Sequence, residues 1–168
     1  HHVMTPFSAL LVLEPGMTVV IEPVTWSEGH AGWRCEELVV VTDDGSTAYV
    51  SLNVSTIVQV DLGSFAVTDR IDLGLGGFGE PLIAQDLATI PGRNDIVVVA
   101  LAYMSGGIAG ARAIVGGEAL ALGLSTVDAP DRIEATSATP LFGYRSGQRL
   151  HMTLVVGPAG LTASSSVG

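Results

Sequence analysis

The sequence predicts an all-β repeat protein, and three observations support that prediction. Short segments that alternate apolar and polar residues recur along the 168-residue chain, separated by turns rich in Gly, Pro, Asn and Asp. The hairpin glycines Gly16, Gly63, Gly117 and Gly160 recur 47, 54 and 43 residues apart. Long stretches of strong helix formers are absent, although 48% of the residues are hydrophobic. We therefore expect many short strands joined by tight turns.

The clearest unit spans residues 39–73. After its opening apolar run, strands are expected at residues 48–52, 56–62 and 65–73. The turns between them are expected at residues 43–46, 53–55 and 63–64. Gly63-Ser64 is typical of a two-residue hairpin, so Phe65 is expected as the first apolar residue of the fourth strand. The unit is thus a four-stranded antiparallel meander.

The same unit recurs twice more. The second copy has expected strands at residues 83–89, 95–101, 111–115 and 119–124, with turns at residues 91–94 and 116–117. The third copy has expected strands at residues 133–137, 141–144, 150–156 and 161–167, with a hairpin at residues 158–160. Residues 9–13 and 17–21, around Pro15-Gly16, match only the third and fourth strands of a unit.

Four-stranded units that repeat every ~40–50 residues are typical of β-propeller blades. We divide the chain accordingly into a leader at 1–6, a half blade at 7–26 and blades at 33–75, 82–125 and 131–168. His1 and His2 resemble a purification-tag remnant. Both faces of a blade are buried by its neighbours, which accounts for the continuous apolar run at residues 96–102. A β-sandwich is the alternative fold, but it does not predict the regular return of turn residues.

The first unit resembles the repeat of YVTN-type bacterial β-propellers. Thr42-Asp43-Asp44-Gly45 stands for the D-G turn of that repeat, Ala48-Tyr49-Val50-Ser51 for its Y-V strand and residues 58–62 for its closing strand. Residues 11–15 echo the closing strand, whereas residues 141–144 keep an aromatic but lack the D-G turn. The resemblance extends over roughly residues 8–168 and implies a scaffold in a secreted or cell-surface bacterial protein. Members usually have seven blades, and this chain has about half of that.

The charge of the chain excludes two classes of partner. The net charge is −10, and all seven basic residues are Arg. An acidic chain repels phosphate backbones and anionic membrane surfaces, so we expect no nucleic-acid partner. The apolar runs are far shorter than the ~18–20 residues that span a bilayer, so we expect no membrane insertion.

The sequence contains no recognisable catalytic, cofactor or metal site. Residues 74–79 match G-x-G-x-x-G, but no βαβ unit surrounds them, so we expect a loop between blades. His30 and His151 lack the spacing of a zinc site, and Cys35, the only cysteine, is expected as a small buried side chain. Six aspartates are expected to cap turns and strand ends: Asp43, Asp44, Asp61, Asp69, Asp72 and Asp86.

The remaining hypotheses concern binding. Trp26, Trp33 and Tyr103 form the candidate surface for a protein or glycan ligand, because exposed aromatic rings stack on sugars and anchor partners. We expect a non-catalytic scaffold or protein-interaction segment, with a glycan-binding module and a propeller enzyme of lactonase or quinoprotein-like type as alternatives. A half ring leaves apolar blade faces open, which predicts self-association or pairing with the remaining blades of a longer chain. Residues 9–13 and 161–167 are the expected adhesive edge strands.

Overall fold

The computed structural model describes residues 12, 14–21, 24–25, 29, 33–34, 37–52, 55–77, 79–122, 132–135, 141–145, 148–157 and 160–167. The regular elements formed by these residues are all β-strands, and no helix occurs among them. The all-β prediction is therefore confirmed. Within the same residues there is no helix long and apolar enough to cross a membrane.

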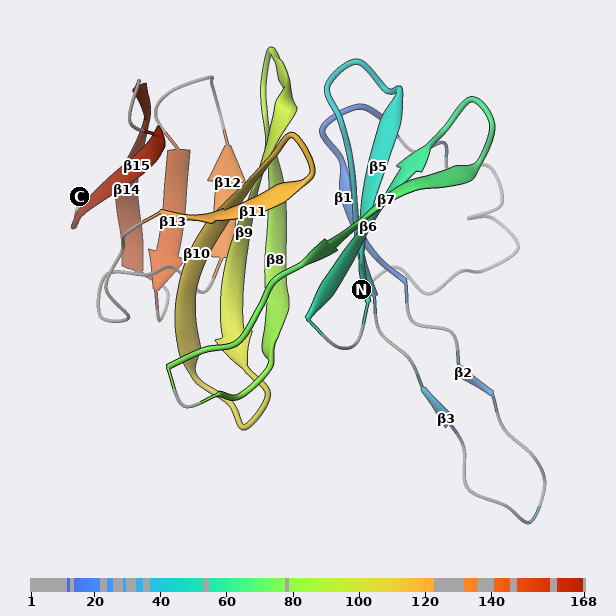
Figure 1. Cartoon of the computed structure of the whole chain (residues 1–168), viewed down its shortest axis with the longest axis horizontal. Coiled ribbons are helices and arrows are strands. Elements are labelled where there is room, and N and C mark those ends of the chain that lie inside the picture. The colour runs from blue at the N-terminus through green and yellow to red at the C-terminus, as the bar shows by residue number, and fades with distance from the viewer. Residues whose placement is uncertain are drawn as a thin grey trace.

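The first sheet contains five antiparallel strands in the order β1-β4-β5-β6-β7. Their bounds are β1 (Thr18–Ile21), β4 (Glu37–Val41), β5 (Thr47–Leu52), β6 (Thr56–Asp61) and β7 (Ala66–Asp72). Between β1 and β4 the chain forms a two-stranded pair of β2 (Val24–Thr25) and β3 (Trp33–Arg34), which projects away from the sheets (Figure 1).

β1 joins this first sheet, whereas residues 17–21 are expected from the sequence to belong to a separate half blade at 7–26. The other strand expected there, residues 9–13, lies outside the described residues except for Val12. The excursion through β2 and β3 brings the chain back antiparallel to β1, so that Thr18 lies opposite Val40. The hydroxyl of Thr18 also donates a 3.0 Å hydrogen bond to the carbonyl of Leu87 in the next sheet. The spacing of turn residues in the sequence does not predict this pairing, because the pairing depends on the path of the chain between β1 and β4.

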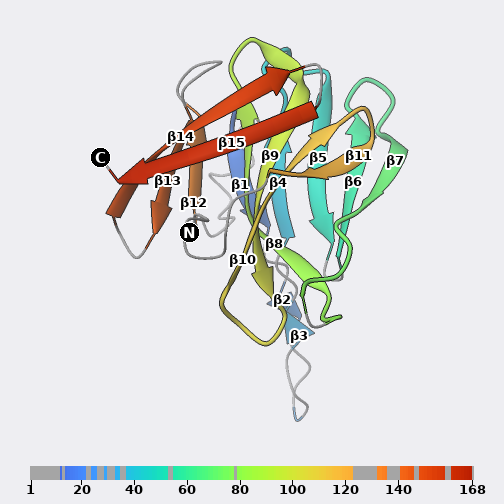
Figure 2. The same ribbon diagram turned by 60° about the vertical axis from the view of Figure 1, so that its left-hand side comes forward.

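The second and third sheets are four-stranded antiparallel meanders. The second has the order β11-β10-β9-β8 and contains β8 (Leu82–Ile90), β9 (Arg93–Tyr103), β10 (Ile108–Val115) and β11 (Glu118–Ala121). The third has the order β12-β13-β14-β15 and contains β12 (Arg132–Ala135), β13 (Leu141–Arg145), β14 (Gln148–Gly157) and β15 (Gly160–Val167). Figure 2 shows β14 and β15 running obliquely to the strands of the other sheets.

The three sheets are stacked in layers, with the second sheet in the middle (Figure 1). Its first strand, β8, lies against β4 on one side and β12 on the other. Its last strand, β11, lies against β7 and β15. The first strands β8 and β12 of the second and third sheets and β4, the second strand of the first sheet, are therefore neighbours, as are the last strands β7, β11 and β15. The described strands do not close into a ring.

The central strand β9 is buried on both faces. Val97, Val98 and Val99 are all fully buried, although adjacent residues of a strand point to opposite faces. Val97 and Val99 join the apolar cluster between the first and second sheets, which also contains Tyr49. Val98 joins a separate cluster on the other face. The continuous apolar run that the sequence shows at this position is therefore explained by a neighbouring layer on each side.

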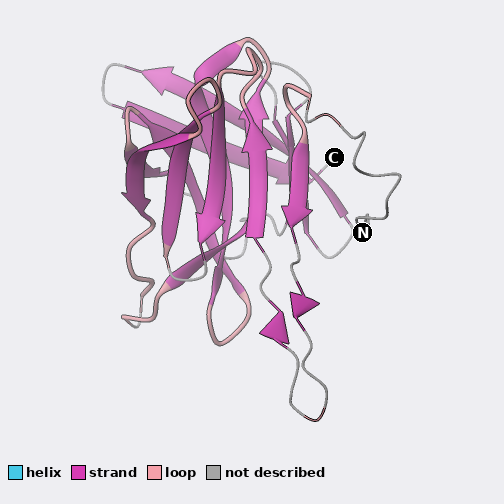
Figure 3. Cartoon of the chain, turned by 90° about the vertical axis from the view of Figure 1, so that its right-hand side faces the viewer, coloured by secondary structure: helices cyan, strands magenta, loops and turns pink. Residues whose placement is uncertain are grey.

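The first sheet turns a second apolar face away from the core, and Figure 3 looks at the molecule from that side. Val39, Val41 and Ala48 form the buried centre of this outer face, with Val50, Val60 and Leu62 half-buried around them. Val67, which lies opposite Val60 in the ladder, is 50% exposed. The outer face thus combines a buried aliphatic centre with an accessible apolar margin.

Candidate interaction surface

The structure does not bring the three aromatic residues of the predicted surface together among its described side chains. Trp26 lies outside the described residues, as does the side chain of Trp33, whose backbone belongs to β3. Tyr103 is the last residue of β9 and is half-buried. Its ring lies so close to Gly76 that a methyl group on that glycine would collide with it. Tyr103 is therefore a packing residue of the loop below it.

That loop connects β7 to β8 and contains the G-x-G-x-x-G run. The amide of Gly76 donates to the carbonyl of Glu80 at 2.8 Å, and the amide of Gly79 donates to the carbonyl of Gly76 at 3.0 Å. The chain continues directly into strand β8 at Leu82, so no helix N-terminus is available to hold a phosphate. The prediction of a loop between sheets at this run is confirmed.

The Glu80 carboxylate ties this loop to the turn between β9 and β10. Its Oε2 accepts a hydrogen bond from the Ser105 hydroxyl at 2.9 Å, and its other oxygen accepts one from the Ser105 backbone amide. The turn itself is closed by a 2.9 Å hydrogen bond from the amide of Gly106 to the carbonyl of Tyr103. The two loops therefore form one hydrogen-bonded unit, which we call the loop end.

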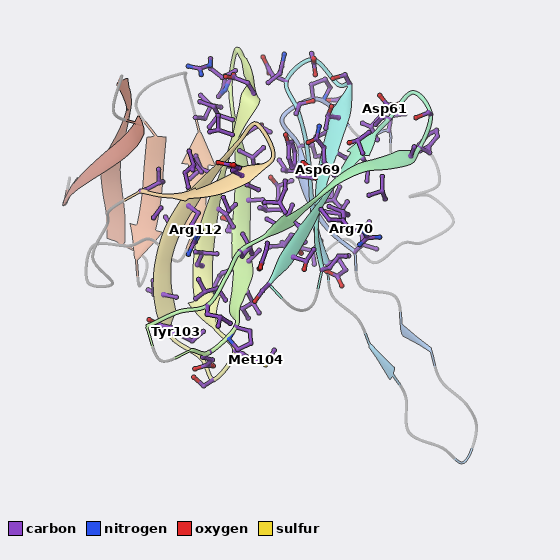
Figure 4. All side chains as sticks on the ribbon, in the orientation of Figure 1. Asp61, Asp69, Arg70, Tyr103, Met104 and Arg112 are labelled. Atoms are coloured by element: carbon purple, nitrogen blue, oxygen red, sulfur yellow. The ribbon has the colours of Figure 1, made fainter. Side chains whose placement is uncertain are left out.

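The loop end presents a small apolar surface. Leu75 is 62% exposed and Met104 is 53% exposed, and Tyr103 lies beside Met104 in the chain. Figure 4 shows Tyr103 and Met104 at the same end of the second sheet. Leu75 and Met104 are therefore the accessible apolar side chains of the loop end.

The hairpin turns β4–β5, β6–β7, β8–β9 and β10–β11 lie toward the opposite end, which we call the turn end (Figure 1). Asp44 and Asp61 cap turns as predicted, whereas Asp69 and Asp86 lie inside β7 and β8 and not at a turn or strand end. Oδ1 of Asp44 accepts hydrogen bonds from the backbone amide and the hydroxyl of Ser46, at 3.0 and 2.9 Å. Oδ1 of Asp61 accepts the equivalent pair from Ser64, at 2.7 and 2.6 Å. The hydrogen bonds from these serines lower the pKa of both carboxyl groups.

Two of these turns are joined across the sheets. The Asp43 carboxylate accepts a 2.9 Å hydrogen bond from the amide of Gly92. In the other direction, the amide of Asp44 donates to the side-chain carbonyl of Asn94 at 3.1 Å. The β4–β5 turn of the first sheet is thereby fixed to the β8–β9 turn of the second. Asp43 thus links two layers, a role beyond the local capping that its sequence context predicts.

A polar row crosses the first sheet on the face that meets the second. Tyr49 lies opposite Gln59, and Gln59 lies opposite Asp69, so the three side chains share one face. Asp69 reaches the β10–β11 turn, where a methyl group on Gly117 would collide with its carboxylate. Burial raises the pKa of the Tyr49 phenol above its ordinary value, and the charges of Asp69 and Asp95 raise it further. The row therefore forms a polar border of the apolar core between the sheets. Its environment disfavours the phenolate form of Tyr49.

Arg93 and Asp95 form a two-pronged ion pair on β9. Nε of Arg93 donates to Oδ1 of Asp95 at 2.8 Å, and its terminal nitrogen donates to Oδ2 at the same distance. The hydrogen bond from Arg93 lowers the pKa of Asp95, so the pair stays charged under mildly acidic conditions. The Arg93 guanidinium is therefore paired with a carboxylate of the same strand.

Phe65 lies on the surface, although the sequence predicts it as the first apolar residue of a strand. It precedes β7, which begins at Ala66, and Asp61 pairs with Ala66, so residues 62–65 form a four-residue turn in place of the two-residue hairpin expected at Gly63-Ser64. The hydrogen bonds from Ser64 to Asp61 set this longer turn. Phe65 consequently has a φ of 54° and is 80% exposed, the largest exposed fraction among the exposed large apolar side chains described.

The described part of the chain contains no group of three or more His, Cys, Asp or Glu side chains arranged to hold a metal ion. No protein-family model, curated protein sequence or solved structure matches the chain.

Proposed function

We propose that this chain is a non-catalytic scaffold or protein-interaction segment of β-propeller type, which belongs to a bacterial surface or secreted protein. Two features of the fold support the proposal. The second and third sheets are four-stranded meanders, and β4–β7 form a third meander within the first sheet. The first strands β4, β8 and β12 lie next to one another, as do the last strands β7, β11 and β15. Neighbouring propeller blades pack in this manner.

The observation that carries the proposal is the contrast between the middle sheet and the first sheet. The middle sheet is buried on both faces, which is the environment that these apolar strands require. The outer face of the first sheet is also aliphatic and its centre is buried, but its margin is not: Val50, Val60 and Leu62 are only half-buried and Val67 is exposed. We infer that this face is completed by a further sheet, from a second copy or from the remaining blades of a longer chain.

The proposed pairing can be tested with a charged side chain on the outer face. Val67 and Thr68 are adjacent exposed residues of β7, and Val67 shares a face with Val60. Val67→Glu should reduce the molar mass of the assembly, measured by light scattering after size exclusion, because it places a charge in the contact. Thr68→Glu, the matched control, should leave the molar mass unchanged. Equal masses for wild type and Val67→Glu would overturn the proposed use of this face.

A glycan-binding role remains the second candidate from the sequence. Its aromatic platform would have to come from Trp26 and Trp33, because the Tyr103 ring is packed against Gly76. Substituting each Trp by Ala and measuring binding on a glycan array tests this alternative. Binding that depends on either Trp would favour the glycan module over the scaffold.

A further inference from the structure

The tip of the β6–β7 hairpin carries an apolar side chain at a position that is unfavourable for it in two ways. Phe65 has a φ of 54°, a conformation that L side chains other than Asn and Asp rarely adopt and for which Gly is the usual residue. Its ring is also 80% exposed to water. Neither folding nor solubility gains from an aromatic ring here, and the exposed ring is accessible for a contact outside the chain.

Hydrogen bonds within the turn hold the tip in one conformation without a partner. Asp61 accepts hydrogen bonds from both the amide and the hydroxyl of Ser64, the residue directly before Phe65. The pairing of Asp61 with Ala66 closes the turn on its other side. A pre-formed turn loses less conformational entropy on binding than a mobile one, which suits Phe65 to act as an anchor.

The charge around the tip selects the kind of partner. The Asp61 carboxylate lies in the turn itself, and a 2.9 Å hydrogen bond from the amide of Leu62 to the carbonyl of Ser46 places the β4–β5 turn, with Asp43 and Asp44, beside it. Arg93, the arginine of the β8–β9 hairpin, is engaged by Asp95 and does not neutralise the others. With a net charge of −10 on the whole chain, a second copy would be repelled from this end, whereas a basic surface would be attracted.

We propose that the β6–β7 hairpin tip is a docking element for a basic protein segment, with Phe65 inserting into apolar side chains of that segment and the surrounding carboxylates pairing with its Lys or Arg residues. This inference rests on the proposed protein-interaction role and names its partner by chemistry. Aromatic anchors surrounded by polar rims are typical of protein-binding surfaces. The tip adjoins the outer face of the first sheet, because Leu62 belongs to the turn and also packs on that face. Val67→Glu and Phe65→Gly therefore both have to be measured to tell the two contacts apart.

The test uses a fluorescein-labelled peptide of alternating Lys and Leu as the probe, with a Glu/Leu peptide of equal length as its control. Fluorescence anisotropy should show that the whole chain binds the Lys/Leu peptide, more weakly as salt is raised, and does not bind the Glu/Leu peptide. Phe65→Gly should weaken binding about tenfold or more, as expected for loss of an aromatic anchor. The same variant should unfold at a higher urea concentration, because Gly adopts the positive φ without strain.

Leu75→Ala is the matched control, since Leu75 is also an exposed apolar residue but belongs to the loop end. It should leave peptide binding unchanged. Absence of Lys/Leu binding, or equal binding by Phe65→Gly and wild type, would overturn the inference. A wild-type oligomer that becomes a monomer in Phe65→Gly would also overturn it, by assigning the tip to a contact between copies. If the wild type is a monomer and binds the Lys/Leu peptide through Phe65, the inference about the tip is supported. Only the proposed pairing of outer faces between two copies is then contradicted.

Discussion

The ring of Tyr103 lies directly on Gly76, so the end of β9 and the loop between β7 and β8 share one packed contact. A methyl group on Gly76 would also come within 3.0 Å of the Leu82 side chain. We therefore expect Gly76→Ala to destabilise the fold by about 1–3 kcal/mol, the usual cost of overpacking. Urea denaturation measures the change.

Gly77→Ala is the control for this prediction, because nothing lies within 4 Å of a methyl group at Gly77. It should change stability by no more than about 0.5 kcal/mol. Adding Tyr103→Ala to Gly76→Ala should cost less than the sum of the two single changes, because the collision is then removed. Additive effects would mean that the ring and the glycine do not touch.

Ser55 should be replaceable by Gly with a gain in stability. Its φ is 50°, and its buried hydroxyl has no hydrogen-bond partner in the described structure. Gly removes both penalties, and we expect a gain of about 1 kcal/mol in the free energy of unfolding. Ser55→Ala removes only the hydroxyl, so thermal unfolding should show a smaller gain. An equal gain for the two variants would indicate that the backbone is not strained there.

The stability of the fold should fall at alkaline pH through Tyr49. Its folded-state pKa lies above the ordinary value of 10.0, so the unfolded chain loses the phenolic proton first as the pH rises. The stabilisation is therefore complete below about pH 10 and is lost progressively above it. Urea titrations at about pH 8 and about pH 11 should show the loss in wild type and a smaller loss in Tyr49→Phe. The same loss in both proteins would exclude Tyr49 as its source.

Adjacent residues of β9 should be equally sensitive to truncation. Val97 and Val98 point to opposite faces, and both are fully buried. We expect Val97→Ala and Val98→Ala each to cost about 2 kcal/mol, from lost apolar burial and the cavity left behind. Denaturant unfolding of the two variants gives the comparison. A cost confined to one of them would show that β9 has one face in water and that the sheets are not stacked on both sides.

The strands and most turns follow from the sequence because they depend on local chemistry. Alternation places β5, β6 and β10 close to their observed bounds, and Gly116-Gly117 forms the expected hairpin. Aspartates at turn positions predict capped turns, and the structure confirms this at Asp44 and Asp61. These features need no knowledge of distant residues.

The sequence does not reveal the features that depend on contacts between distant segments. The pairing of β1 with β4 needs the path of the chain through β2 and β3. The packing of Tyr103 on Gly76 joins residues from different loops. The exposure of Phe65 follows from a turn two residues longer than the Gly63-Ser64 pattern predicts, and such a change moves a side chain from the sheet into solvent.

The molar mass of the chain in solution, measured by size exclusion with light scattering, tests the central claim most directly. The claim is that the outer apolar face of the first sheet, around Val60 and Val67, requires a neighbouring sheet. The account predicts a mass of at least twice the 17.3 kDa of one chain. A stable monomer at all concentrations would contradict the pairing of this face with a second copy.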